Sequence, residues 1–559
     1  MVKKILSFVG KEISGLHEAA YLLALSSIAS LIFALVRDRL LAHMLGAGPE
    51  LDVYYAAFRV PDFIFIAVAS LVSTSILVPF LIESRQKGES ELKESIQGLF
   101  SAFSLLILVV CAVAFAFMEP IQRMLFPRLF EAGLGGELVH VSRILLLSPA
   151  LLGLSNFFAS ITQIQNRFMV YALSSPLYNV GIILGIVFLL PSMGITGIAM
   201  GVVFGALMLS LTQIPLVIRD GLFPRFTWRC NWSHVKKVAR LSVPRTVTMS
   251  SQQLTNLALI SFASFLGAGS ISIFNLSQNL QSVPLSIIGV SYSSAIFPML
   301  ARLMGEGRRD VFVGKMISAA QHVIFWSVPL SVLFIVLRAQ IVRTVLGSGE
   351  FTWSDTRITA AALALFVVST VGQSLILLFV RSFYAEGKTA KPLLMNVSSM
   401  IVTVALGFGL TKLFHAVPAF RYFVESILRV EGSADTTVLM LPLAFSLGIF
   451  LNLFLHWRAF AREFPGFTYP VLKTTFHSLS ASIIGGFAAY KSLRVFDDVF
   501  DLATVHGIFL QGLCAGIVGI IAIVIVLAIV RSKELKDVWG ALHQKVWKVD
   551  RASLDKLPL

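Results

Sequence analysis

Long apolar runs separated by short polar links extend over most of this chain. A membrane-spanning helix needs about 20 mostly apolar residues, and about 14 runs are long enough to be spans. The pattern therefore predicts an all-α polytopic membrane protein of about 14 transmembrane helices. The expected spans are 18–44, 53–82, 97–118, 141–163, 171–190, 194–217, 240–266, 272–300, 317–337, 358–381, 389–411, 437–457, 472–490 and 509–530.

The composition supports a membrane protein over a soluble one. Hydrophobic residues make up 56% of the chain and charged residues 13%, whereas soluble domains hold about 45–50% and about 25%. The formal net charge is +15, a value that in a soluble protein would point to a nucleic-acid partner. Here the charges lie between apolar runs, so we expect no nucleic-acid partner, and expect membrane lipids as the surroundings.

The distribution of cations predicts the orientation. Of the 45 lysines and arginines, about 30 fall in the termini and the even-to-odd loops and about 11 in the opposite loops. The excess places both termini in the cytoplasm. Three polar segments follow from this topology: an amphipathic interfacial helix at 1–17, a basic cytoplasmic linker at 218–239 and a cytoplasmic tail at 531–559.

An internal repeat divides the chain into two halves. Leu-Gly-Ala-Gly occurs at residues 45–48 and again at 266–269, each time between two predicted helices. Six helices separate the copies, so the two halves face the same way in the membrane. We predict two parallel-repeat lobes of six helices around a central cavity, which is a known transporter architecture. The N-lobe would span 18–217 and the C-lobe 240–462, followed at 463–530 by two C-terminal helices.

Charged residues occur inside the first two predicted helices. The first ends with Arg37, Asp38 and Arg39, and the second carries Arg59 and Asp62 on either side of a kinking proline. A charge at the bilayer centre costs about 2.5–3.5 kcal/mol on insertion scales, so such residues usually face a cavity or a partner. The alternatives are arginines that reach the membrane interface and an internal ion pair between Arg59 and Asp62.

Polar residues also line the first two helices of the second half. Arg245, Gln252 and Asn256 share a face of the seventh helix, and Asn279 lies on the eighth. Such amides also serve as ordinary interhelical hydrogen bonds. We interpret the whole set as a cationic cavity that binds an anionic group such as a pyrophosphate. The candidate substrate-binding residues are Arg37, Asp38, Arg59, Asp62, Arg245, Gln252, Asn256 and Asn279, and the candidate gate turns are Gly46, Gly48, Gly267 and Gly269.

Catalytic and metal-binding patterns are missing from the sequence. Glu-Gly-Lys-Thr at 386–389 resembles the end of a nucleotide-binding loop but lacks its first glycine. The three cysteines are far apart, which excludes the usual zinc spacings. We therefore expect a transporter rather than an enzyme, with no cofactor. An ion gradient, the membrane potential or the substrate's own gradient would drive transport.

The opening block of the chain resembles the MurJ (MviN) family of lipid II flippases, in the exporter superfamily that includes the multidrug MATE transporters. The similarity lies in Val-Arg-Asp at 36–38, the turn at 45–48, and Asp-Val-Tyr-Tyr-Ala-Ala-Phe-Arg-Val-Pro at 52–61. Shorter similar pieces extend it along nearly the whole chain, at 165–168, 262–266, 349–352 and 383–385, with Pro392.

The resemblance implies a flippase of the bacterial inner membrane. Its substrate would be undecaprenyl-pyrophosphate-linked peptidoglycan precursor (lipid II), moved to the outer leaflet by alternating access. It also implies a lipid-tail groove along the last two helices, and we expect a monomer. Leu31, Phe65 and Asn279 stand where the family usually has cavity arginines. Arg37 is retained in place, and Arg245 is a candidate replacement cation.

Three other functions fit the same residues. A flippase for another polyprenyl-pyrophosphate-linked glycan would explain the replaced arginines. An ion-coupled exporter of the MATE type would use Asp38 and Asp62 as proton carriers. A membrane scaffold without transport would need no intact site.

Overall fold

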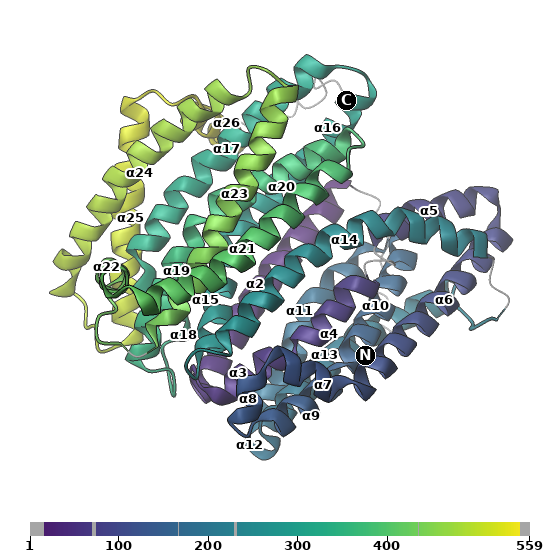
Figure 1. The fold of residues 1–559 in the computed structure, drawn as a ribbon. Coiled ribbons are helices and arrows are strands. Elements are labelled where there is room, and N and C mark those ends of the chain that lie inside the picture. The colour runs from purple at the N-terminus through teal and green to yellow at the C-terminus, as the bar shows by residue number, and fades with distance from the viewer. Residues whose placement is uncertain (1–15, 70–73, 166, 229–231, 434, 548–559) are drawn as a thin grey trace. The chain divides into compact units, whose positions relative to one another are not determined.

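The computed structural model describes residues 16–69, 74–165, 167–228, 232–433 and 435–547. Within these ranges the chain forms α-helices with short π and 3-10 segments and no β-strand (Figure 1). The predicted interfacial helix at 1–17 lies almost wholly outside the described residues. The all-α membrane fold predicted from the apolar runs is confirmed.

The helices follow one another with short connections. Those of the first half are α2 (Leu16–Leu45), α3 (Pro49–Ala57), α4 (Arg59–Ile64), η1 (Phe65–Ala69), α5 (Thr74–Lys87), α6 (Glu89–Ala116), α7 (Met118–Leu125), α8 (Pro127–Glu131), α9 (Gly135–Leu145), α10 (Leu147–Ile164), α11 (Phe168–Leu184), η3 (Gly185–Leu189), α12 (Leu190–Met193) and α13 (Ile195–Arg219). Those of the second half are α14 (Trp232–Ala263), α15 (Ser270–Pro284), η4 (Leu285–Val290), α16 (Ser291–Gly305), α17 (Arg309–Val336), α18 (Arg338–Leu346), α19 (Trp353–Val368), α20 (Thr370–Ala385), α21 (Ala390–Ala416), α22 (Pro418–Leu428), η5 (Thr436–Leu439), α23 (Met440–Glu463), α24 (Thr468–Asp497), α25 (Val505–Ile529) and α26 (Lys533–Trp547).

Each predicted span coincides with a helix or with a run of consecutive helices. Ten stretches of the described residues are long and apolar enough to cross a membrane by length and composition. The remaining predicted spans correspond to α2, to α3 through α5, to α14 and to α24. The structure is consistent with fourteen spans, and that number stays a prediction.

The second predicted span is broken where proline was expected to disturb it. Proline has no amide hydrogen, so Pro61 leaves the carbonyl of Ala57 without its helical partner. The helix accordingly ends at Ala57, turns at Phe58 and resumes at Arg59. The π segment η1 follows at 65–69.

The second half has a π segment at the equivalent place. When the first copy is shifted by the spacing of the two Leu-Gly-Ala-Gly turns, η1 falls on residues 286–290, within η4 (Leu285–Val290). π segments are rare and often lie at functional sites. Their recurrence at one position supports the internal repeat.

The chain packs as two compact units. The first contains residues 1–280, 345–362 and 389–448, and the second contains 281–344, 363–388 and 449–559. These units cut across the predicted N-lobe and C-lobe, whose boundaries stay a prediction. All of the candidate site residues belong to the first unit.

In the first unit, α11 packs against both α2 and α13 (Figure 1). Glycine allows the close approach of α11 and α13. A Cβ atom added at Gly181 would lie 2.2 Å from Cα of Gly205, and one added at Gly185 would lie 2.6 Å from Cα of Gly201. Small residues at fixed spacing bring membrane helices together in this way.

In the second unit, α24 packs along α25 and against α17 (Figure 1). Gly485 and Gly519 face each other between α24 and α25, and each backbone carbonyl lies near the other glycine. Glu534 at the start of α26 is buried and accepts a hydrogen bond of 2.6 Å from the Thr474 hydroxyl on α24. The two C-terminal spans thus form part of a helical bundle with α17.

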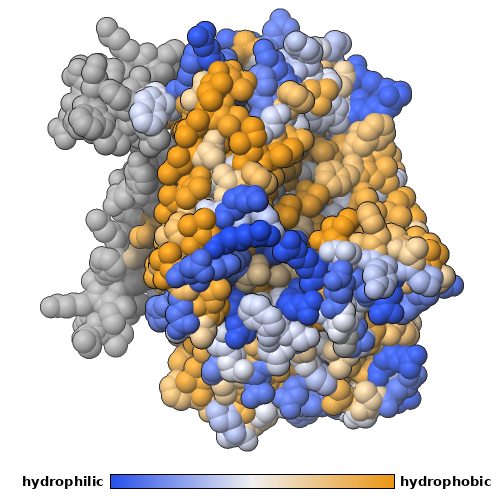
Figure 2. Space-filling model, turned by 90° about the vertical axis from the view of Figure 1, so that its left-hand side faces the viewer, coloured by the Kyte–Doolittle hydropathy of each residue, from blue (hydrophilic) through white to orange (hydrophobic). Residues whose placement is uncertain are grey.

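Apolar side chains remain on the outside of the helices. On α25, exposed aliphatic residues recur at helical spacing at Ile517, Ile520, Ile521 and Val524. Broad apolar areas cover the face drawn in Figure 2. An exposed surface of this kind suits contact with lipid tails rather than with water.

Candidate functional site

Arg37 and Asp38, next to each other on α2, form the centre of a polar cluster. The Nε and Nη2 atoms of Arg37 donate to Oδ1 of Asp38 at 3.0 and 2.8 Å. Its Nη1 atom donates to Oδ1 of Asn179 on α11 at 3.0 Å. The Asp38 side chain is 4% exposed and that of Arg37 is 21% exposed. The arginine is therefore held in place but still reachable.

Asn279 completes the cluster from α15. Its Nδ2 atom donates to Oδ2 of Asp38 at 3.0 Å. Asp38 therefore accepts hydrogen bonds from Arg37 on Oδ1 and from the neutral amide of Asn279 on Oδ2. The sequence placed these three residues in one site, and the structure brings them together. Because Asn279 is neutral, the charge of Asp38 is balanced within this cluster by that of Arg37.

Arg59 is buried and bonded at a second place. Its Nε atom donates to the carbonyl oxygen of Tyr55 at 3.1 Å, and its Nη2 atom donates to Oδ1 of Asn275 at 2.5 Å. Asp62 lies near enough to interact electrostatically, but the described structure holds no ion pair between Arg59 and Asp62. The alternative interpretation as an intrahelical ion pair is therefore wrong, and Asn275 is the close partner.

Among the polar residues predicted to share one face of α14, only some have hydrogen-bond partners in the described structure. Asn256 accepts a hydrogen bond of 3.3 Å from Gln278 on α15. Gln252, one turn earlier, is exposed. Arg245 lies in α14, but its side chain is outside the part of the structure that is described. The interpretation of Arg245 as a replacement cation stays a prediction.

Asp52 binds the beginning of α15. Its Oδ2 atom accepts from the Gly269 amide at 2.7 Å. Its Oδ1 atom accepts from the Ser272 amide at 2.7 Å and from the Ser272 hydroxyl at 2.6 Å. A carboxylate at this place satisfies amides that have no partner within the helix. Asp52 thereby joins α3 of the predicted N-lobe to α15 of the predicted C-lobe.

The two Leu-Gly-Ala-Gly turns lie against other backbone. Gly269 has φ +86°, and a Cβ atom there would lie 2.1 Å from the carbonyl oxygen of Ala47. Gly46 has φ +62°, and a Cβ atom there would lie 2.8 Å from the carbonyl oxygen of Glu350. Gly267 packs on Asp435, whereas Gly48 has only an ordinary contact with its own turn. Gly46, Gly267 and Gly269 thus pack closely against other segments, and the role of the turns as a gate stays a prediction.

Three residues of these networks were not among the predicted binding residues. Asn275 and Asp52 carried a signal, because both are polar residues in predicted helices that contain other polar groups. Asn179 lies in an otherwise apolar run, and its role depends on α11 packing against α2. Only the fold reveals that partner.

The polar cluster is suited to binding an anion. A guanidinium has five N–H donors, and three of them contact Asp38 and Asn179. Two N–H groups of Arg37 remain without a partner among the described residues. A planar pair of donors fits two oxygens of a phosphate.

Comparison with known proteins gives one consistent family. The family model described as lipid II flippase MurJ matches residues 41–506. The probable lipid II flippase MurJ of Vibrio cholerae is 27% identical over 408 residues, covering 70% of this chain and 77% of that protein. The probable lipid II flippase MurJ of Thermotoga maritima is 26% identical over 435 residues, covering 75% of this chain and 87% of that protein.

Solved structures share the fold. Lipid II flippase MurJ in an inward closed conformation matches with a TM-score of 0.71 and 22% identity, covering 91% of this chain and 98% of that chain. An inward-facing multidrug resistance MATE family transporter of the MOP superfamily matches with a TM-score of 0.59 and 15% identity, covering 78% of this chain and 96% of that chain. The fold is therefore the one common to both groups of transporter.

Proposed function

This chain belongs to the lipid II flippase MurJ family, and from that membership we propose that it carries lipid II from the cytoplasmic to the outer leaflet of a bacterial inner membrane. The protein would bind the substrate through the substrate's anionic pyrophosphate group. The family match over residues 41–506 carries this proposal. The held but reachable guanidinium of Arg37 supports it.

The polar residues differ in how accessible they are, and this decides the role expected of each in binding the substrate. Arg37 keeps two unused N–H groups and is partly exposed, so it is the side chain best placed to bind a phosphate oxygen. Arg59 is buried and bonded to Asn275, so it contributes positive potential more than direct contact. Arg245 would bind the second phosphate.

Asp38 acts on the substrate through Arg37. Both donor atoms that it accepts from Arg37 lie on one edge of the guanidinium, which leaves the remaining N–H groups turned elsewhere. An incoming phosphate would compete with this carboxylate for the same cation. Asp38 and Asn279 thus position Arg37 and moderate its affinity, so that the substrate can also be released.

Movement of the substrate would follow from parting of the two turns. The contacts of Gly269 with Ala47 and of Asp52 with α15 join the predicted lobes near residues 45–52 and 266–272. The cation distribution assigns these turns to the outer side. We propose that they stay joined while the site faces the cytoplasm and part when it faces outward.

The test is rescue of a bacterium depleted of its own lipid II flippase. The wild-type gene is compared with Arg37→Ala, Arg245→Ala and Arg39→Ala. Arg39 is the matched control, because it lies on α2 two residues from Arg37 but donates to the carbonyl oxygen of Val345 at 3.3 Å. We expect growth with the wild type and with Arg39→Ala, and no growth with Arg37→Ala or Arg245→Ala.

Blotting of the membrane fraction verifies that every variant is inserted. Growth of cells that carry only Arg37→Ala would refute the cationic site. A well-expressed wild-type protein that fails to rescue would shift the proposal to another polyprenyl-pyrophosphate-linked glycan. Reconstitution with fluorescent lipid II in vesicles then separates that outcome from incompatibility with the host.

A further inference from the structure

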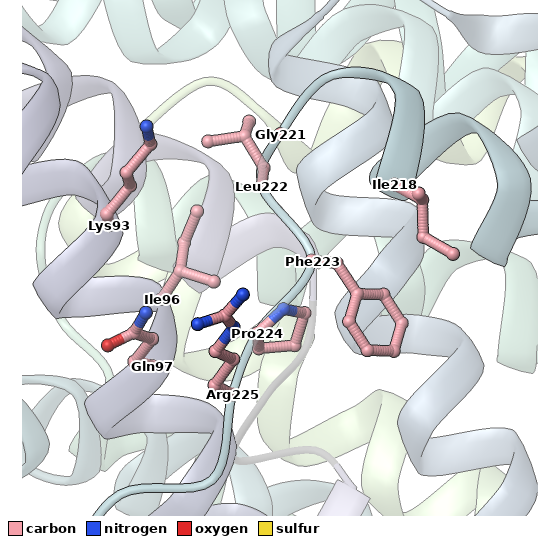
Figure 3. A pocket seen from close by; sticks show the side chains of 9 residues that line it. All are labelled: Lys93, Ile96, Gln97, Ile218, Gly221, Leu222, Phe223, Pro224 and Arg225. Atoms are coloured by element: carbon pink, nitrogen blue, oxygen red, sulfur yellow. The ribbon is translucent and has the colours of Figure 1, made fainter.

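The first unit contains a pocket that shares no residue with the polar cluster around Arg37. It has a volume of about 490 Å³ and is formed between the first turns of α6, the last turn of α13 and the segment that follows α13 (Figure 3). The lining residues are Lys93, Ile96, Gln97, Ile218, Gly221, Leu222, Phe223, Pro224 and Arg225. The pocket thus combines two cations and an amide with an apolar wall.

The two cations come from opposite sides of the pocket. Figure 3 shows Lys93 and Gln97 on α6, with the guanidinium of Arg225 reaching from the segment toward Gln97. Lys93 and Arg225 are exposed to solvent. The side chains of these two residues and of Gln97 have no hydrogen-bond or ion-pair partner among the described residues. Their donors are free to bind an anion.

Three other cations of the same unit, Lys87, Lys237 and Arg167, are engaged. The ammonium groups of Lys87 and Lys237 both contact the carboxylate of Glu83, at 3.2 and 2.8 Å. Hydrogen bonds from these two lysines hold the pKa of Glu83 below its usual value. Arg167 pairs with Asp220 at 2.7 Å. The absence of a carboxylate is therefore a property of the pocket rather than of the surface around it.

Aromatic and aliphatic side chains place the pocket at the level of lipid head groups. Phe226 and Trp228 meet edge to face at 5.2 Å and are 48% and 80% exposed. Ile218 and Phe223 are also exposed. Exposed aromatic residues beside cations are typical of the boundary between membrane and water. The cation distribution assigns this boundary to the cytoplasmic side.

We propose that this pocket binds the head group of an anionic phospholipid from the cytoplasmic leaflet. Lys93 and Arg225 contact the phosphate from two sides, and Gln97 donates to a head-group oxygen. Ile96, Leu222 and Pro224 contact the glycerol and the first acyl carbons. A lipid fits better than a free phosphate, because one wall is apolar and exposed aromatic residues, Phe226 and Trp228, directly follow the lining residues in the chain.

The experiment measures lipids retained by the full-length protein. The protein is reconstituted in nanodiscs of phosphatidylcholine with or without phosphatidylglycerol, and bound lipid is counted by native mass spectrometry after release. The wild type is compared with Lys93→Gln/Arg225→Gln. Each cation at the membrane surface strengthens the binding of anionic lipid. Removing two of them is expected to reduce the preference for phosphatidylglycerol about 30-fold. Size-exclusion profiles verify that the variant is folded.

The matched control is Lys236→Gln/Arg240→Gln. It removes two exposed cations from the first turns of α14, on the same predicted side, and neither residue lines the pocket. We expect it to keep the preference. If both double variants lose the preference for phosphatidylglycerol equally, general surface charge and not the pocket binds the lipid, and the proposal is wrong. If soluble glycerol 3-phosphate displaces the lipid, the pocket binds a free phosphate compound, and the proposal of a lipid site is wrong.

Discussion

At the scale of single residues, Asp52 offers a direct test of the contact between α3 and α15. Its carboxylate is buried and accepts three hydrogen bonds from Gly269 and Ser272. In Asp52→Asn one oxygen becomes an amide group, whose hydrogens face an N–H donor instead of accepting from it. Hydrogen bonds to charged groups are worth about 1.5–3 kcal/mol each. We expect Asp52→Asn to lower the free energy of unfolding by about 3 kcal/mol, measured by thermal unfolding in detergent.

Ser272→Ala is the graded control for this prediction. It removes the hydroxyl donor but keeps the Ser272 amide, so we expect a loss of about 1 kcal/mol. If the contact also closes the outer side, Asp52→Asn should increase the labelling of a cysteine placed at Ala47. Unchanged stability and unchanged labelling in Asp52→Asn would show that the cap does not hold the two turns together.

The candidate site could be predicted where charge stands out against an apolar background. Arg37, Asp38 and Asn279 were placed in one site from the sequence, and the structure joins them. Asn179 could not be found in this way, because an amide in an apolar helix has no preferred partner until the helices are packed. The pairing of Arg59 with Asn275 rather than with Asp62 depends on where α15 lies, which helical spacing within α4 does not give.

At the scale of elements, the close contact of α11 and α13 depends on glycine. A Cβ atom at Gly201 would lie 2.6 Å from Cα of Gly185, so a larger side chain must push the two backbones apart. Overpacking of this kind costs about 1–3 kcal/mol and sometimes more. We expect Gly201→Leu to lower the unfolding free energy by at least about 3 kcal/mol and to reduce the amount of protein in the membrane. Thermal unfolding and blotting measure the two effects.

Gly409→Leu is the matched control. Gly409 lies in α21, and an added Cβ atom there would meet no other atom within 4 Å. Replacing glycine within a helix gains about 0.5–1 kcal/mol of helix propensity. We therefore expect Gly409→Leu to be neutral or stabilising. Equal destabilisation by both variants would attribute the loss to added bulk in the membrane, not to the contact between α11 and α13.

The apolar runs predicted every long helix, although the helices that carry polar groups are the less apolar ones. Of the four predicted spans that fail a strict test of length and apolarity, three are α2, the run from α3 to α5, and α14. They contain all of the candidate substrate-binding residues except Asn279. The same polar side chains that make these helices unusual are the reason for proposing a site there. The helix α22 between α21 and α23 was not predicted, since its 11 residues are too few for a span.

At the scale of the whole molecule, the two compact units show what a sequence repeat leaves open. A repeat indicates which helices are equivalent, but not which of them pack together. The contacts of Asp52 and Asn279 tie residues of the predicted C-lobe to α3 and α2 within one unit. Such contacts are expected to change during alternating access, so lobes and packing units need not coincide in any one state.

The orientation in the membrane gives the last prediction, which depends on charge alone. The cation excess places both termini, and the loop between α5 and α6, in the cytoplasm. The same rule places the turn between α12 and α13 outside. Ser90, in the first turn of α6, and Ser192, in α12, are exposed residues next to these two places. In a chain whose three native cysteines are replaced, we expect Ser192→Cys to react with a membrane-impermeant maleimide in intact cells. Ser90→Cys should react only after the inner membrane is permeabilised, and the reverse pattern would invert the topology and move the lipid pocket to the outer leaflet.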